Sequence, residues 1–359
     1  MLFFYLLVVC LVLYYVIKKL STPHGLKKLP SPAGGIFYFG NFWQVGPEPH
    51  KKFTEWAKIL GDIYSIQMGQ QHWIILTGDK VVGDLLQKRG GKYSSRPPNH
   101  YFYQILRRSK GFVNCPYNER YRMLAPIMLE LLGQQTVKEN SDLIDSQFRI
   151  LMQNLYRASA DIKDSLFPKY YFQLAGLNII TILCLAKSIK DVEDPFYQEF
   201  ESYMKNHLEL IKVTNRLSDF FPILRLFSKN KLYNQVIEDR KIAEAFYGRL
   251  VQEVKNDSEN KPCFVRSLLR KVDEGILDEL DVVYLMSNIF SAGTDTISSS
   301  LTWITAALAN NPQVQHKAHQ ELDQVIGHSR LPSASDEPNL SYIRAIIKEG
   351  QRYCGPIYL

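Results

Sequence analysis

Cysteine is scarce in this sequence and falls into no metal-binding pattern. The 359 residues contain five cysteines, which form no Cys-x-x-Cys pair and no zinc-type spacing. Zinc modules need closely spaced thiolate or imidazole pairs, so a structural zinc module is excluded. The odd number and wide spacing of the cysteines also argue against a disulfide framework, and we expect reduced thiols that face the cytosol.

Long runs of one charge are also missing. Lys and Arg number 43 and Asp and Glu 36, which gives a formal net charge of +7, but the positive charges are scattered. This pattern disfavours nucleic acid as a partner, whereas a modest basic excess suits an anionic membrane surface or an acidic partner protein. With 46% hydrophobic and 22% charged residues, no solenoid-type repeat and no low-complexity tract, the composition is that of a globular protein.

The longest uncharged apolar run stands at the N-terminus. Residues 2–17 carry no charge, and lysine pairs follow at 18–19 and 27–28. As a helix the run would span about 24 Å at about 1.5 Å per residue, slightly less than a bilayer of ~27 Å. Leu20 and snorkelling lysines can supply the difference.

A cleaved signal peptide is the alternative interpretation of this run. No basic residue precedes the run and no Ala-x-Ala-like cleavage site follows it, which disfavours cleavage. Because the lysines all lie on the C-terminal side, that side is expected to stay cytosolic. We therefore predict a transmembrane signal-anchor at residues 1–20, in the endoplasmic reticulum membrane, with the body of the chain in the cytosol.

The remaining chain divides into a linker and a body. Residues 21–35 are rich in Pro and Gly and predict a stiff linker. In the body, residues 36–359, two β-prone runs at 63–68 and 72–76 flank Gly69-Gln70-Gln71 and predict a β-hairpin. From about residue 120 to 350 the hydrophobic period is helical, with breaks at 163–168, 219–222 and 256–262. The expected fold is mainly α, with a small N-terminal β-sheet; the length allows two domains or one large helical domain.

One long apolar helix contains a cluster of poor helix formers. Ala292-Gly293-Thr294-Asp295-Thr296 is followed at once by three serines, 298–300. Gly costs roughly 1 kcal/mol relative to Ala inside a helix, and Thr, Asp and Ser are also unfavourable there. Local rules that fail together favour a functional site, although a tolerated polar kink in a core helix is the alternative.

These five residues resemble the oxygen-binding helix motif of the cytochrome P450 monooxygenases. Five further segments resemble motifs of that family in the family's order. They are the Pro-rich hinge with Leu29-Pro30-Ser31-Pro32 and Gly40-Asn41, Tyr93-Ser94-Ser95-Arg96-Pro97, residues 111–122, Asn311-Pro312 with Glu321-Leu322 and Gly327, and Glu349-Gly350-Gln351-Arg352. The resemblance covers nearly the whole chain and implies a P450-like helical body that is incomplete at the C-terminus.

The resemblance implies a haem b (iron protoporphyrin IX) cofactor and assigns roles to residues of the motif. Ala292 and Gly293 would leave room for the haem face and bound dioxygen. Thr296 would hydrogen-bond the dioxygen or an ordered water, and Asp295 would relay protons. For Asp295 taken alone, a surface carboxylate is the alternative.

Two further sets of residues are implied by the resemblance. Tyr121 and Ala125 stand where the family has a Trp and an Arg that hold the haem propionates. In this chain Tyr121, together with Arg122 or Arg120, would have to bind the propionates instead. Glu349 and Arg352 correspond to a buried ion pair that fixes the haem-side fold. Residues 96–114 and 216–227 would face an apolar substrate, although their aromatic side chains suit a plain core or a membrane contact equally.

The family's proximal ligand is a cysteine in a Phe-x-x-Gly-x-Arg-x-Cys-x-Gly loop far beyond the Glu-x-x-Arg motif. In this sequence Cys354 is a partial match, but its neighbours belong to the helix of Glu349 and Arg352, and we reject it because the loop must be irregular backbone. We therefore expect a haem-dependent monooxygenase chain, fed by an NADPH-dependent cytochrome P450 reductase, that is inactive without this loop. The alternatives are a truncated, non-catalytic, membrane-anchored chain and, less in keeping with the ordered motifs, an unrelated helical scaffold.

Overall fold

The computed structural model describes residues 28–97, 100–161, 166–212, 217–224 and 231–353, together with Val9 and Val12. Within these residues no helix is both long and apolar enough to cross a lipid bilayer. The anchor predicted at residues 1–20 lies outside the described residues, apart from the two valines, and it stays a prediction.

Internal contacts divide the chain into two units, Met1–Lys88 and Arg89–Leu359. This division falls inside the stretch 36–359 that the sequence suggested as one body. The first unit contains the elements α2 (Phe42–Val45), α3 (Pro49–Leu60), β1 (Ile63–Met68), β2 (Gln71–Leu76), α4 (Asp79–Val82) and the π-helical η1 (Gly83–Lys88).

The predicted β-hairpin is confirmed in the first unit. Strands β1 and β2 pair antiparallel, with Ile63 opposite Leu76 and Met68 opposite Gln71. Gly69 adopts a left-handed φ of 58°, which a glycine tolerates without strain, and so closes the turn. The Pro-rich segment joins the sheet, because Ser65 N–H donates to the carbonyl of Pro30 over 2.8 Å.

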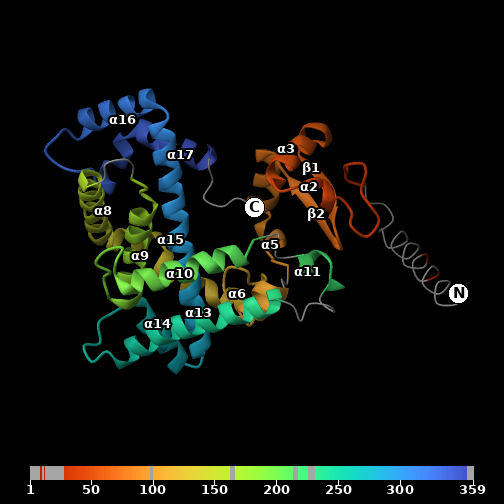
Figure 1. The fold of residues 1–359 in the computed structure, drawn as a ribbon, viewed down its shortest axis with the longest axis horizontal. Coiled ribbons are helices and arrows are strands. Elements are labelled where there is room, and N and C mark those ends of the chain that lie inside the picture. The colour runs from red at the N-terminus through yellow and green to blue at the C-terminus, as the bar shows by residue number, and fades with distance from the viewer. Residues whose placement is uncertain are drawn as a thin grey trace. The chain divides into compact units, whose positions relative to one another are not determined.

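The helices and strands described for the second unit are all helices, joined by loops (Figure 1). Its elements are α5 (Gly90–Tyr93), the π-helical η2 (His100–Leu106), α6 (Glu119–Leu132), α7 (Gln134–Glu139), α8 (Ser141–Asp161), α9 (Lys169–Leu185), α10 (Pro195–Leu210), α11 (Leu217–Phe220), α13 (Lys231–Asn256), α14 (Phe264–Asp273), α15 (Glu279–Ala309), α16 (Pro312–Val325), the 3₁₀-helical η4 (Ala334–Asn339) and α17 (Ser341–Tyr353). The mainly helical fold with a small sheet is thus confirmed, and the predicted break at 256–262 separates α13 from α14. The predicted break at 163–168 lies partly outside the described residues, and that at 219–222 begins within α11.

Helix α15 is the central element of this unit (Figure 1). It begins with a capping box in which Asp278 and Asp281 each accept the other's backbone N–H, and it ends at Ala309, with Pro312 then starting α16. Helices α9, α13 and α14 pack against it, and α16 and α17 contact it as well. The main hydrophobic core forms here from fully buried side chains of neighbouring helices, among them Leu177, Phe200, Tyr247, Val265 and Phe290.

Candidate functional site

Asp295 lies on the side of α15 that faces α9. Its Oδ1 accepts a long hydrogen bond of 3.4 Å from Gln173 Nε2, and its Oδ2 is buried without a hydrogen-bond partner. Burial raises the pKa of Asp295, a shift that Gln173, Lys169 and His207 partly offset by favouring the charged form. A carboxyl group of this kind keeps its proton at higher pH than an exposed aspartate does, as a proton-relay acid requires.

Thr296, about 100° further round the helix than Asp295, lies on a partly open side of α15. Its hydroxyl donates to the carbonyl of Ala292 over 2.7 Å, one turn earlier, and Ala292 is exposed. Because the single hydroxyl hydrogen is used in this bond, the oxygen offers only its lone pairs to a further partner. In this arrangement Thr296 can accept a hydrogen bond from a water or a protonated ligand atom.

At Gly293 and Thr294, α15 lies in close contact with α9. A Cβ built on Gly293 would stand 2.9 Å from Ile180 Cδ1, and a Cβ on Gly176 would stand 3.6 Å from the carbonyl oxygen of Gly293. The side chain of Thr294 is fully buried and its Oγ1 has no hydrogen-bond partner. Helix packing is therefore sufficient to explain glycine at 293, and the predicted role beside a haem face remains a prediction.

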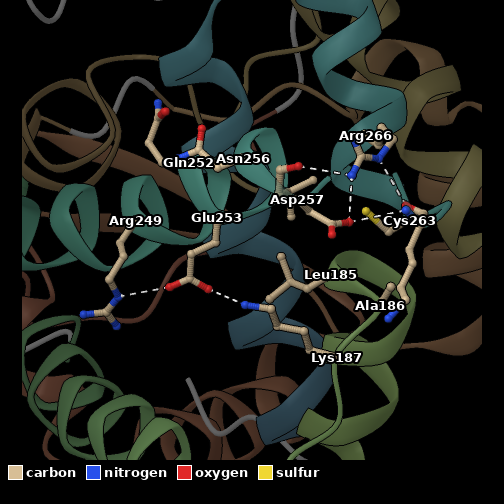
Figure 2. A pocket seen from close by; sticks show the side chains of 12 residues that line it. Leu185, Ala186, Lys187, Arg249, Gln252, Glu253, Asn256, Asp257, Cys263 and Arg266 are labelled. Atoms are coloured by element: carbon tan, nitrogen blue, oxygen red, sulfur yellow. Dashed lines mark hydrogen bonds and ion pairs between the residues drawn. The ribbon is translucent and has the colours of Figure 1, made fainter. Parts of the chain in front are cut away.

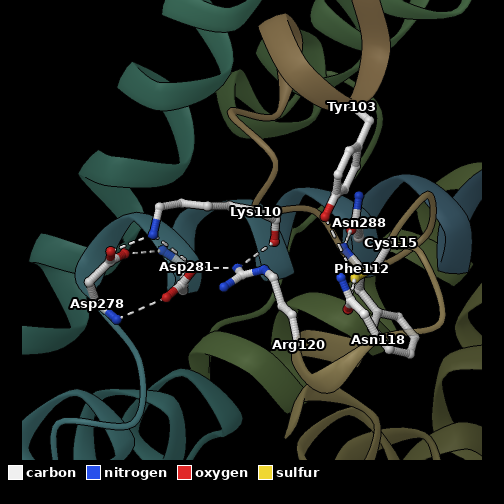
Figure 3. A network of polar contacts seen from close by, with 9 residues as sticks. All are labelled: Tyr103, Lys110, Phe112, Cys115, Asn118, Arg120, Asp278, Asp281 and Asn288. Carbon is white, nitrogen blue, oxygen red and sulfur yellow. Dashed lines mark hydrogen bonds and ion pairs between the residues drawn. The ribbon is translucent and has the colours of Figure 1, made fainter. Parts of the chain in front are cut away.

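The segment before α6 fixes the start of α15 by polar contacts (Figure 3). Arg120 Nη2 donates to Asp281 Oδ1 over 2.5 Å, and Lys110 pairs with both Asp278 and Asp281. Asn288 Oδ1 accepts the backbone N–H of Phe112 over 2.7 Å. Arg120, one of the two arginines suggested for a propionate, is thus already held in an ion pair at the end of α15 remote from the motif.

Tyr121 and Arg122 lie in the first turn of α6, where Asn118 caps the helix through the N–H of Tyr121. The Tyr121 ring stacks on Phe112 with ring centroids 5.4 Å apart, and the exposed Arg122 guanidinium lies 5.6 Å from the centre of the Tyr117 ring. Both side chains have aromatic contacts, and among the described residues neither the Tyr121 hydroxyl nor the Arg122 guanidinium has a hydrogen-bond or ion-pair partner. Their assignment to the cofactor stays a prediction.

Glu349 and Arg352 form the predicted ion pair on α17. Two hydrogen bonds of 2.6 and 2.7 Å join the guanidinium to the carboxylate. Their side chains are 60% and 71% exposed, however, so the burial implied by the resemblance is not seen. The reason is that α17 packs against α15 through other residues, Gly350 lying directly against Ile304. Cys354 lies outside the described residues.

Two cavities accompany these helices. One, of about 720 Å³, is a groove between the end of α15, the start of α16 and α17, with a largely apolar lining that includes Trp303, Ile304, Val314, Ile346 and Tyr353. The other, of about 510 Å³, lies where α9 ends beside α13 and α14 (Figure 2). Both acidic side chains of its lining are held in ion pairs, since Glu253 pairs with Lys187 and Arg249, and Asp257 pairs with Arg266.

A buried polar network on the N-terminal side of the motif was not predicted from the sequence. Arg107 donates to Ser287 over 2.5 Å and lies 3.3 Å from His207 Nε2, while His207 Nδ1 lies 2.8 Å from Asp239. Tyr203 is buried beside His207. The network joins the segment after η2 to α10, α13 and α15, and these partners are too distant in sequence for any periodic pattern to connect them.

In the described residues a half-buried acid, Asp295, and an alcohol, Thr296, occupy adjacent positions of the long central helix α15, as the resemblance predicted. A family sequence profile described as "Cytochrome P450" matches residues 30–359. The chain belongs to the cytochrome P450 family.

Curated relatives agree with this assignment. The chain is 26% identical over 356 residues to "Cytochrome P450 monooxygenase verL" of Clonostachys rogersoniana, covering 96% of this chain and 64% of the relative. It is 30% identical over 341 residues to "Cytochrome P450 monooxygenase polD" of Polytolypa hystricis, covering 92% and 63%. It is 27% identical over 357 residues to "Trans-cinnamate 4-monooxygenase" of Arabidopsis thaliana, covering 96% and 70%. The chain therefore spans about two thirds of the length of the relatives it matches.

The described residues fit one side of a haem pocket. The small Ala292 and the hydroxyl of Thr296 stand one turn apart on the open side of α15, where a flat macrocycle could approach. The described cysteines do not fit the ligand on the other side. Cys184 is fully buried in the main core, where burial raises the pKa of its thiol, Cys115 is buried beside Tyr103, and Cys263 lines the charged cavity next to α14.

Proposed function

We propose that this chain carries the distal part of a haem-dependent monooxygenase site that inserts one atom of dioxygen into an apolar organic substrate. The observation that carries the proposal is the placement of Asp295 and Thr296. One side chain is a half-buried carboxyl group whose Oδ2 is buried without a hydrogen-bond partner, and the other is a hydroxyl on the open side of the same turn. Relatives named as monooxygenases support it.

Haem, when bound, supplies dioxygen binding and cleavage of the oxygen–oxygen bond, which consumes protons. The chain's own contribution is to hold and deliver those protons. The raised pKa of Asp295 lets it bind a proton closer to neutral pH, and Thr296 positions a donor such as a water by accepting its hydrogen bond. Ala292 keeps that side of the helix free of large side chains.

A second candidate is a non-catalytic member of the family that folds or associates without binding haem iron through a thiolate. The observation that favours it is the position of Cys115, Cys184 and Cys263, which are buried or remote from the open side of α15. In that case residues 292–296 would keep the family's motif without a catalytic role, and Asp295 would deliver no proton to a reaction.

The carbon-monoxide difference spectrum of the reduced, haem-reconstituted chain separates the two candidates. For the chain as given we expect haem to bind weakly and to give no thiolate-type band. A thiolate-type band would overturn the non-catalytic alternative, and its loss in Cys354→Ser would identify that cysteine as the ligand. The same spectrum in a chain extended by a Phe-x-x-Gly-x-Arg-x-Cys-x-Gly segment tests the monooxygenase proposal directly, because failure to form the band there would contradict it.

We also propose that the chain is anchored by residues 1–20 in the endoplasmic reticulum membrane, with its body in the cytosol and an NADPH-dependent cytochrome P450 reductase as electron donor. The apolar run followed by lysines supports the orientation. Protease digestion of microsomes carrying the tagged chain tests it: a C-terminal tag should be digested from the outside. Protection of that tag would contradict the orientation.

A further inference from the structure

A chain of buried polar side chains leads from α10 through α9 to the carboxyl group of Asp295. Tyr197 of α10 donates through its hydroxyl to Gln173 Oε1 over 2.8 Å. Gln173 of α9 then presents its Nε2 to Asp295 Oδ1 at 3.4 Å. Tyr197 and Gln173 are 1% and 4% exposed, so neither can exchange these contacts for water without opening the helix interface. Such buried polar side chains need defined partners.

The direction of these hydrogen bonds fixes the amide of Gln173. An amide has a donor end and an acceptor end, and the Tyr197 hydroxyl engages the acceptor end. The donor end is thereby turned towards α15, where a carboxylate oxygen can accept from it. Asp295 Oδ2 has no hydrogen-bond partner, so the two oxygens of this carboxyl group are distinct.

The same residues have a second hydrogen-bonding arrangement within reach. Tyr197 Oη also lies 3.2 Å from the carbonyl oxygen of Tyr170. If Asp295 is protonated, its O–H needs an acceptor, which a rotated Gln173 amide supplies through Oε1. The amide NH₂ then donates to Tyr197, and the tyrosine hydroxyl donates to Tyr170. Each protonation state of Asp295 therefore has its own hydrogen-bonded arrangement with Gln173, and the orientation of the amide distinguishes the two states.

We propose that Gln173 is a positioning residue for Asp295: oriented by Tyr197, its amide donates to Oδ1 and so favours the ionised form of the carboxyl group. The proton-relay role of Asp295 in this inference rests on the proposed function, whereas the contacts between Tyr197, Gln173 and Asp295 do not depend on it. The charged groups that act on Asp295 besides this amide are Lys169 on α9 and His207 and Glu201 on α10. The lysine and the histidine favour the carboxylate, and the glutamate opposes it.

An infrared pH titration of the full chain measures the positioning directly. The carbonyl stretch of the protonated carboxyl group is followed against pH and assigned to Asp295 by its loss in Asp295→Asn. Gln173→Leu should shift the midpoint to higher pH, because the charge-assisted donor to the carboxylate is lost while the burial remains. Gln173→Glu should shift it further, because a second carboxyl group then faces the first.

Tyr197→Phe is the second variant and keeps the side-chain volume nearly unchanged. We expect a shift in the same direction but smaller than that of Gln173→Leu, since the amide remains but is no longer oriented. Tyr203→Phe is the matched control: it lies on the same helix, is 4% exposed, and its hydroxyl has no hydrogen-bond partner. It should leave the midpoint unchanged.

The proposal is overturned if Gln173→Leu, folded by circular dichroism, titrates like the unmodified chain, or if Tyr203→Phe shifts the midpoint as much as Tyr197→Phe. The proposed function fails separately. If Asp295→Asn in a haem-loaded, extended chain leaves oxygen consumption and product yield unchanged, Asp295 relays no proton, although Gln173 still positions it.

Discussion

The two halves of α15 have different surroundings although they belong to one continuous helix. Residues 282–290 of the first half are all buried, and their neighbours come from α9, α13 and α14. In the second half Ala292, Ile297 and Trp303 are exposed, and α17 contributes no buried residue to that side. The first half therefore stabilises the fold, while the second half carries the predicted site residues Asp295 and Thr296 and lines the open apolar groove. The predicted oxygen-binding motif, residues 292–296, lies where one environment changes into the other.

The largest expected effect comes from truncating an aromatic side chain in the buried half. Phe290→Ala removes a fully buried ring that contacts Phe200 and Tyr247, and should lower the free energy of unfolding by about 3–5 kcal/mol. Trp303→Ala in the open half, where the ring is 46% exposed, should cost about 1 kcal/mol or less. Denaturant titrations compare the two. Equal losses would show that the second half is as well packed as the first.

The next effect concerns the ion pairs at the start of the buried half. Asp281→Asn leaves Lys110 and Arg120 without their shared carboxylate and weakens the capping box, and should cost about 2–3 kcal/mol because both cations are only partly exposed. Glu279→Gln is the control in the same turn, since its exposed pair with Lys255 should contribute less than about 1 kcal/mol. If the two substitutions gave similar unfolding midpoints, the Asp281 contacts would not stabilise this end.

A smaller effect is expected where α17 meets the open half. Gly350→Ala places a methyl group against Ile304, which should cost about 1–3 kcal/mol, while the gain in helix propensity returns about 1 kcal/mol. The double variant Gly350→Ala with Ile304→Ala should be more stable than the sum of the single changes predicts. If the stability changes of the two single variants, measured by thermal unfolding, add up to that of the double variant, the added methyl group does not clash with Ile304.

The smallest effect is a pH-dependent one at the boundary. Burial raises the folded-state pKa of Asp295 above its unfolded value, so its ionised form opposes folding at neutral pH. Asp295→Asn should therefore stabilise the chain at neutral pH. The gain should shrink as pH falls through the folded pKa and be gone below the unfolded pKa, where both states carry the proton. A gain that is independent of pH, or a loss at neutral pH, would contradict the buried-acid interpretation.

The sequence predicted the elements of this fold better than their contacts. The hairpin turn follows from glycine and alternating β-prone residues, and the start of α15 follows from Asp278, whose short side chain caps the helix. These are local effects, so a single sequence contains them. The exposure of Glu349 and Arg352 depends instead on which segments cover α17, and helical spacing predicts only that the two side chains meet.

The candidate site was predicted only in part for the same reason. Asp295 and Thr296 could be recognised because polar residues interrupt an apolar helix. Gln173 could not, because 122 residues separate it from Asp295 and an isolated glutamine in an apolar helix carries no recognisable pattern. Arg107 and Ser287, 180 residues apart, form a buried contact of the same kind. Pairings across such distances are set by how helices pack.

Asp281 takes part in two structures at once, because it completes the cap of α15 and also receives Lys110 and Arg120. The loop that carries Lys110 cannot detach without weakening the first turn of the helix. Amide hydrogens of the loop and of residues 282–290 should consequently exchange with solvent together and slowly, in one cooperative opening. Beyond Ala292 the exchange should become faster residue by residue. The turn of residues 292–296 would then mark the border between a slowly and a rapidly exchanging part of one helix.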